Sequence, residues 1–209
     1  MNYTHFQKPS RYINREINSI HKKAPVTVAL AFPDVYEIGM SHLGMKVLYH
    51  IINNLSFTSA ERVFAPWTDL EEALKKGGLL LSSLESKRPL REFDIIGFSL
   101  QYELSYTTVL HMLDLGGVPV RREERLNAKN SPLVIAGGPC TVNPLPMAAF
   151  IDAFLIGDGE EAVPEILHAY HQWKAGGQDN KHSLLQALSD IGGVYVPAFG
   201  REKSVSRRY

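Results

Sequence analysis

Cysteine is the scarcest informative residue in this chain, since Cys140 is the only one among 209 residues. A single thiol excludes an internal disulfide, and it excludes a four-cysteine zinc site or iron–sulfur cluster held by this chain alone. The 22 basic and 22 acidic residues balance, so the composition indicates no nucleic-acid partner. No apolar run reaches the roughly 18 residues that span a bilayer, and the N-terminus lacks the apolar core of a secretory signal. The composition predicts a cytoplasmic α/β protein with no membrane partner.

Several nucleotide-binding and acyl-transfer motifs are also missing. A dinucleotide-binding protein has G-x-G-x-x-G after its first strand, but this chain has FPDVYEIG there. The sequence contains no Walker loop and no G-x-S-x-G elbow, because GFSLQ lacks the second glycine. These absences argue against NAD, ATP and serine-hydrolase chemistry.

What the chain does contain is a series of short apolar runs that alternate with helix-like segments. The runs are VTVALAF at 26–32, a second near 61–65, and then DIIGFSL, PLVIAGGP and DAFLIGDGEE. Helical spacing is found at about 41–53, 68–76, 103–115 and 160–174, with a last short helix at 183–189. We take Ser41 as the N-cap of the first helix.

Continuously apolar strands separated by helices are typical of a parallel sheet that is covered on both faces. We therefore predict an α/β fold with a doubly wound, mainly parallel five-stranded sheet, either flavodoxin-like or Rossmann-like. We assign residues 1–23 to an N-terminal arm or helix, 24–175 to the α/β domain and 176–209 to a C-terminal appendage.

In such a sheet, ligands bind over the carboxyl ends of the strands. The loops at that edge carry Ser99 after the third strand and the pair Gly137–Gly138 after the fourth. Glycine lets a ligand or another backbone approach closely. Each residue taken singly is also ordinary turn chemistry, but their grouping on one edge favours a binding site.

Longer segments of the chain carry a family resemblance. PSRYINREIN, FPDVYEIGMSHLGM, FDIIGFSLQYELSYT and VIAGGPC, together with the turn IGDGEE, resemble the N-terminal cobalamin-binding-type domain of a family of radical SAM proteins. The resemblance covers nearly the whole chain. It implies that the following residues bind the cofactor: Asp34, Tyr36, Gly39, Ser99, Leu100, Tyr102, Gly137, Gly138, Pro139, Gly157, Gly159 and Glu160.

One position departs from that pattern. Cobalamin domains that supply a cobalt ligand have D-x-H-x-x-G after the first strand, and here Tyr36 stands in the histidine position between Asp34 and Gly39. A phenol with a pKa of about 10 is a poor cobalt donor at neutral pH. We expect cobalamin to bind without a histidine from this chain, and we assign the nearby His42 a surface or capping role rather than ligation.

The resemblance also implies a second domain. Radical SAM chemistry uses three cysteines to hold a 4Fe-4S cluster that binds S-adenosylmethionine, and this chain has one. We therefore expect the chain to be a fragment that is not an enzyme alone, with the radical SAM domain of the same polypeptide as its partner. Two other functions stay open: a degenerate flavodoxin-like module that only packs on the catalytic barrel, and a nucleotide-binding regulator that lacks its motifs. A pocket plugged by Tyr36, Tyr102 or Trp67 would favour the degenerate module.

Two polar clusters have simpler explanations than metal binding. Asp158, Glu160 and Glu161 stand where carboxylates stabilise the first turn of a helix. His168 and His171 share a helix face, but no carboxylate partner is evident. We predict no metal site in this chain.

Overall fold

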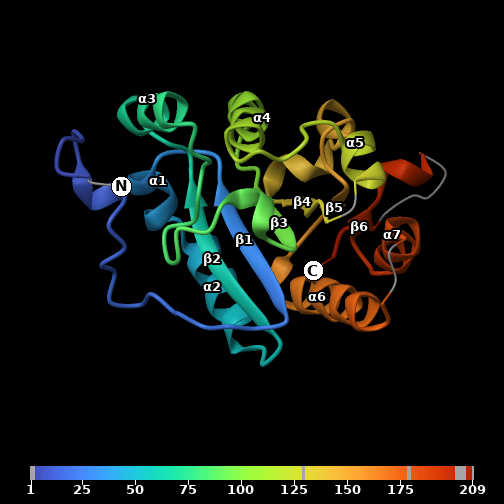
Figure 1. Ribbon diagram of the computed structural model, residues 1–209. Coiled ribbons are helices and arrows are strands. Elements are labelled where there is room, and N and C mark those ends of the chain that lie inside the picture. The colour runs from blue at the N-terminus through green and yellow to red at the C-terminus, as the bar shows by residue number, and fades with distance from the viewer. Residues whose placement is uncertain (1–2, 129, 178–179, 201–205, 209) are drawn as a thin grey trace.

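The computed structural model describes residues 3–128, 130–177, 180–200 and 206–208 as a sheet between two layers of helices (Figure 1). The sheet has six strands in the order β2-β1-β3-β4-β5-β6. Neighbouring strands pair in parallel from β2 to β5, and β6 pairs antiparallel with β5. The strands are β1 Val26–Phe32, β2 Thr58–Phe64, β3 Ile95–Ser99, β4 Leu133–Gly137, β5 Ala153–Leu155 and β6 Val194–Tyr195. This is the doubly wound α/β fold predicted above, with flavodoxin-like order over β1–β5.

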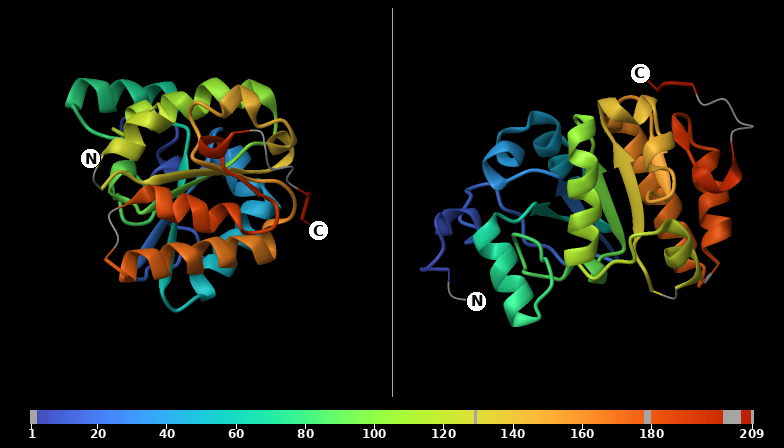
Figure 2. Two further views of the ribbon diagram at one scale, coloured as in Figure 1. Left: turned by 90° about the vertical axis from the view of Figure 1, so that its right-hand side faces the viewer. Right: turned by 90° about the horizontal axis from the view of Figure 1, so that it is seen from above.

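Helices cover both faces of the sheet (Figure 2). One face packs against α2, α6 and α7, and the other packs against α3 and α4. The helices are α1 Tyr36–Ser41, α2 Leu43–Asn54, α3 Thr68–Gly77, α4 Tyr106–Leu115, α5 Arg122–Asn127, α6 Gly159–Ala175 and α7 Lys181–Ser189. Because both faces are covered, side chains on either side of a strand are buried, which explains the continuous apolar runs.

The two core layers divide alternate residues of each strand. Val28 and Leu30 of β1 face α2 and α6, whereas Ala29 and Ala31 face the α3–α4 layer. Ile166 of α6 is 1 % exposed, and burial of one such side chain contributes about 1.5–3 kcal/mol. The layer between the sheet and α2 and α6 is the one that contains the candidate site.

The structure corrects several predicted boundaries. The first predicted helix begins at Leu43 instead of Ser41, because His42 is extended, and a separate helix, α1, precedes it where a loop was expected. Ser41 therefore ends α1, and the N-cap of α2 is His42, whose Nδ1 accepts a hydrogen bond from Met45 N at 3.2 Å. The second strand begins at Thr58, earlier than expected, and the sheet has six strands instead of five.

Both ends of the described chain pack against the domain. The N-terminal arm contacts α1 and α3 through Arg11–Glu37 and Tyr12–Asp69. Near the C-terminus, α7 and β6 add buried side chains to the layer that contains α6. The backbone of Arg208 then bonds to the loop after β5. No helix within the described ranges is both long and apolar enough to cross a membrane.

Candidate functional site

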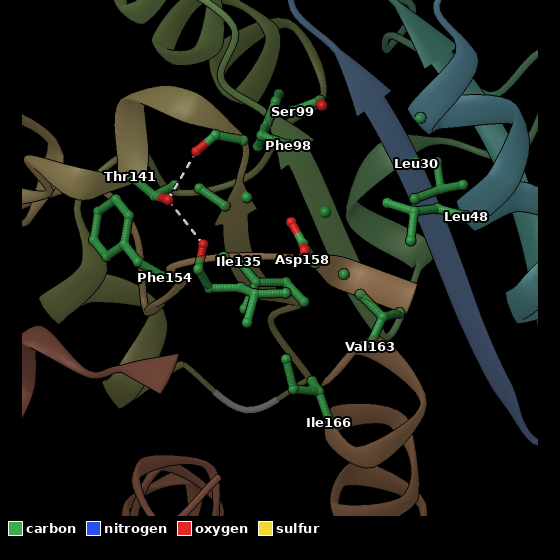
Figure 3. A pocket seen from close by; sticks show the side chains of 18 of the residues that line it. Leu30, Leu48, Phe98, Ser99, Ile135, Thr141, Phe154, Asp158, Val163 and Ile166 are labelled. Carbon is green, nitrogen blue, oxygen red and sulfur yellow. Dashed lines mark hydrogen bonds between the residues drawn. The ribbon is translucent and has the colours of Figure 1, made fainter. Parts of the chain in front are cut away.

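A cavity of about 470 Å³ lies between the sheet and helices α2 and α6. Apolar side chains from β1, α2, β4 and α6 form its walls (Figure 3). The loops at the carboxyl ends of β3, β4 and β5 line its outer part. The cavity therefore lies at the edge where an open α/β sheet binds ligands. Its main apolar wall residues are Leu30, Leu48, Ile52, Ile135, Val163 and Ile166.

Two glycines inside neighbouring strands leave this space open. Gly97 of β3 and Gly137 of β4 both line the cavity. A Cβ placed on Gly137 would meet no atom within 4 Å, and one on Gly97 would meet only Leu30 at 3.9 Å. Glycine inside a strand commonly marks a close approach by a ligand or another backbone. The side chains that would fill the cavity from the sheet are absent at these two positions.

The exits of β3 and β4 are fixed to each other at Gly138. Leu100 N donates to Gly137 O at 2.8 Å, and Cys140 N donates to Leu100 O at 3.2 Å. Gly138 has φ +102°, and a Cβ there would lie 2.7 Å from Leu100 O. The Thr141 hydroxyl lies 2.8 Å from the carbonyl oxygens of both Gly138 and Leu155, so it links the loop to β5 (Figure 3).

The two adjacent glycines should differ in how much their replacement by alanine lowers the free energy of unfolding. We expect Gly138→Ala to lower the free energy of unfolding by about 1–3 kcal/mol, because alanine is strained at positive φ and would contact Leu100 O. Gly137→Ala serves as the control and should leave stability nearly unchanged. Urea unfolding of both variants checks this, and equal losses would contradict the assigned roles.

The polar side chains that line the cavity come from loops, strand ends and helix starts. Ser99 Oγ accepts a hydrogen bond from Gln101 Nε2 at 3.1 Å. Asp158 and Glu160 lie at the start of α6, and His42 lies at the start of α2. The deep part is apolar, so the cavity suits a ligand with a buried apolar end and a polar end at the loops.

The loop after β1 forms a separate hydrogen-bonded structure. Tyr36 donates to Glu16 Oε1 of the N-terminal arm at 2.5 Å, and its ring meets Phe64 edge-on. Burial, followed by the bond to Glu16, raises the pKa of Tyr36 to about 12. The phenol is therefore protonated at neutral pH and already bonded elsewhere. Asp34 Oδ2 accepts from Tyr102 at 2.5 Å, which connects this loop to the loop after β3.

Seven of the twelve predicted site residues line the cavity. They are Ser99, Gly137, Gly138, Pro139, Gly157, Gly159 and Glu160. The other five lie outside its lining. Asp34, Tyr36 and Tyr102 form the contacts just described, Leu100 packs in the α3–α4 layer, and Gly39 makes room for the Phe64 ring, which would lie 2.3 Å from a Cβ.

The helical walls of the cavity were not predicted from the sequence. Leu48, Val163 and Ile166 have the spacing of ordinary core residues, and nothing in that spacing distinguishes a cavity from a filled core. Gly97, inside an otherwise apolar strand, was the available signal. Trp67 also lies outside the cavity lining.

Other candidate groups do not form metal sites in the described part of the chain. No group of three or more His, Cys, Asp or Glu side chains there is arranged so that it could hold a metal ion. The rings of His168 and His171 both contact Phe57, each with centroids 4.6 Å apart. Cys140 is buried, and this burial raises the pKa of its thiol.

The fold and cavity define an α/β module with flavodoxin-like strand order and a cavity at the carboxyl edge of its sheet. The chain belongs to the family described as radical SAM proteins, N-terminal, whose family model matches residues 44–197. It is also 27 % identical over 183 residues to an uncharacterised protein of Methanocaldococcus jannaschii. That similarity covers 87 % of this chain and 31 % of the relative, so the chain spans about a third of the relative's length. No solved structure matches the chain significantly.

Proposed function

We propose that this chain is a cobalamin-binding domain of a radical SAM enzyme, and that the cavity holds the nucleotide tail of the cofactor. The observation that carries the proposal is the open apolar space beside Gly97 and Gly137 at the carboxyl edge of the sheet. Membership of the radical SAM N-terminal family supports it. The walls come from both α2 and α6, so a bound tail would be enclosed between helices and sheet.

The size and polarity of the cavity fit this ligand. A volume of about 470 Å³ falls within the range of about 300–1,000 Å³ that is usual for small-molecule sites. The benzimidazole end of the tail is flat and apolar and suits the wall formed by Leu48, Ile135 and Ile166. The phosphodiester and corrin are polar and suit the loops that carry Ser99 and Gly138. None of Tyr36, Tyr102 and Trp67 lines the cavity, which favours cofactor binding over a plugged structural module.

No residue at the loop after β1 is suited to coordinate cobalt. Tyr36 is a protonated phenol bonded to Glu16. The Nδ1 atom of His42 accepts the Met45 N–H and caps α2. The residues present therefore fit a cofactor held by its tail, without a nitrogen ligand from this loop.

The parent protein would carry out the chemistry with a further domain. Bound cobalamin supplies methyl transfer or assists a radical step, and a 4Fe-4S cluster with S-adenosylmethionine would supply the radical from the radical SAM domain of the same polypeptide. The residues of this chain bind and orient the cofactor. Leu30, Leu48 and Val163 exclude water from its buried end.

Removal of the nucleotide tail from the ligand tests this mode of binding. We expect cobinamide, which lacks the tail, to bind at least about tenfold more weakly than hydroxocobalamin, because the apolar end of the ligand is lost. Anaerobic titration of the purified protein, followed by corrin absorbance, measures both affinities. Equal affinities would show that the cavity does not hold the tail.

Substitution of Tyr36 tests the claim that this residue does not coordinate cobalt. We expect bound hydroxocobalamin to have the same absorption spectrum in Tyr36→Phe as in the wild type at each pH, because the Tyr36 phenol has a pKa of about 12 and lies outside the cavity lining. A shift in the corrin bands of this variant would show that Tyr36 coordinates cobalt.

A degenerate module without a cofactor is the second candidate. The hydrogen bond from Tyr36 to Glu16 favours this candidate. Tyr36 stands where related domains have the cobalt ligand, and here it binds the N-terminal arm instead. This candidate predicts that neither corrinoid binds, whereas the cobalamin proposal predicts that only the complete cofactor binds well.

A further inference from the structure

A second cavity, of about 310 Å³, lies beneath the N-terminal arm. Its walls come from the arm, the start of α1, the end of β2, α3 and the segment 79–89. It is distinct from the cavity at the carboxyl edge, since the two share no lining residue. We refer to it as the arm pocket.

The arm pocket combines aromatic rings with positive charge. Three cationic side chains line it, Arg11, Arg62 and Lys87, and no acidic side chain of the described residues does. Its aromatic lining residues are Tyr3, Tyr12, Tyr36, Phe64 and Trp67. Cations beside aromatic faces are a common way to hold a planar anion, because the rings stack on the ligand and the cations pair with its charge.

Arg11 has an unused donor in this pocket. Its side chain is buried, and the guanidinium carbon lies 4.8 Å from the Trp67 ring centroid. The Nε atom donates to Glu37 at 2.9 Å, but the buried Nη1 atom has no hydrogen-bond partner among the described residues. A buried donor without an acceptor destabilises the fold, so an acceptor supplied by a ligand would complete the site.

Lys87 contributes a further cation to the arm pocket. Its Nζ atom donates to the backbone carbonyl oxygens of Tyr12 and Leu84, and no described carboxylate pairs with it. Burial lowers the pKa of this ammonium group. Arg62 differs from Lys87, because Glu85 accepts from its Nε at 2.6 Å. Arg11 is also paired, with Glu37, so the unpaired positive charge is that of Lys87, and Arg11 contributes its free Nη1 donor.

From this geometry we propose that the arm pocket binds a small aromatic carboxylate. The ring lies against the aromatic lining near Trp67, and the carboxylate accepts hydrogen bonds from Arg11 and Lys87. The proposal is independent of cobalamin binding, because the two cavities are separate. It also gives the N-terminal arm a role, since Arg11 and Tyr12 of the arm complete the pocket.

Fluorine NMR on the purified protein with para-(trifluoromethyl)benzoate tests this site. We expect saturable line broadening with a Kd of about 1 mM or tighter, and at least about tenfold weaker binding of the neutral amide, para-(trifluoromethyl)benzamide. Equal binding of the two probes, or no saturable binding of the benzoate, would overturn the proposal. Displacement of the benzoate by inorganic phosphate at equal concentration would also overturn it, since the site would then bind anions without regard to the ring.

Matched variants test whether the benzoate binds in the arm pocket. Arg11→Gln should weaken benzoate binding at least about tenfold. Because Arg11 belongs to the arm and holds it to Glu37, this variant also changes how the arm packs. Ser82 lines the pocket from the opposite wall and does not hold the arm. We expect Ser82→Glu to abolish binding by repelling the carboxylate, and Ser82→Gln, of the same size, to retain it. Binding that survives in Ser82→Glu, or that is lost in Gly137→Leu at the other cavity, would refute the assignment.

Discussion

Replacement of Gly137 by leucine is expected to weaken hydroxocobalamin binding at least about a hundredfold while the fold stays intact. The change adds a branched side chain where a Cβ meets no atom within 4 Å. The leucine side chain therefore enters the cavity, and it requires no shift of the backbone. The measurement is a corrin absorbance titration, with circular dichroism and urea unfolding to verify the fold.

A second glycine variant provides the control for this experiment. Gly77→Leu makes the same chemical change at the last residue of α3, away from the cavity. Its affinity for hydroxocobalamin should match that of the wild type. Wild-type binding by Gly137→Leu would show that the nucleotide tail lies elsewhere.

Loss of the buried charge at Arg125 is expected to destabilise the fold by about 3–5 kcal/mol. Arg125 is 0 % exposed and Asp152 is 1 % exposed. The guanidinium binds Asp152 through Nε and Nη2, at 3.2 and 3.0 Å, and donates to backbone carbonyl oxygens of Pro119, Val120 and Phe150. Arg125→Met leaves the Asp152 carboxylate buried without its partner, and urea unfolding measures the loss.

An exposed ion pair is the control for Arg125. Lys76 and Glu72 pair at 3.2 Å on the surface of α3, with side chains 77 % and 68 % exposed. Because exposed pairs contribute little, Lys76→Met should leave the unfolding midpoint nearly unchanged. A similar small effect of Arg125→Met would mean that Asp152 is accommodated without its partner.

Arg125 also explains why helix α5 was not predicted from the sequence. Helix α5 has the sequence REERLN, which looks like an exposed polar segment. Its inward-facing residue is Arg125, whose burial depends on Asp152 and on carbonyl oxygens from distant segments. Hydrophobic periodicity cannot detect a helix that is anchored by a buried charge.

The parallel sheet was predictable because burial on both faces makes each strand a continuous apolar run. Such a run can be recognised in the sequence without knowing which strand it pairs with. The short antiparallel strand β6 was not predictable, since two residues beside Pro197 carry too little pattern. Helix α1 was not predicted for a related reason, because its six residues are too few to show a helical pattern.

Part of the candidate site was also predictable. Glycines at strand ends identified the loops of β4 and β5, as the lining by Gly137, Gly138 and Gly157 shows. Tyr36 and Gly39 were chosen by motif spacing, and the structure places them against Glu16 and Phe64 instead. Motif spacing locates a residue along the chain, but the direction of its side chain depends on the N-terminal arm, which no local pattern encodes.

Anaerobic titration of the wild-type protein with hydroxocobalamin tests the central claim most directly. We predict a saturable change in the corrin absorbance with a Kd on the order of 10 μM or tighter. An unchanged corrin spectrum at concentrations on the order of 100 μM would contradict cobalamin binding and would leave the cavity at Gly97 and Gly137 without this ligand.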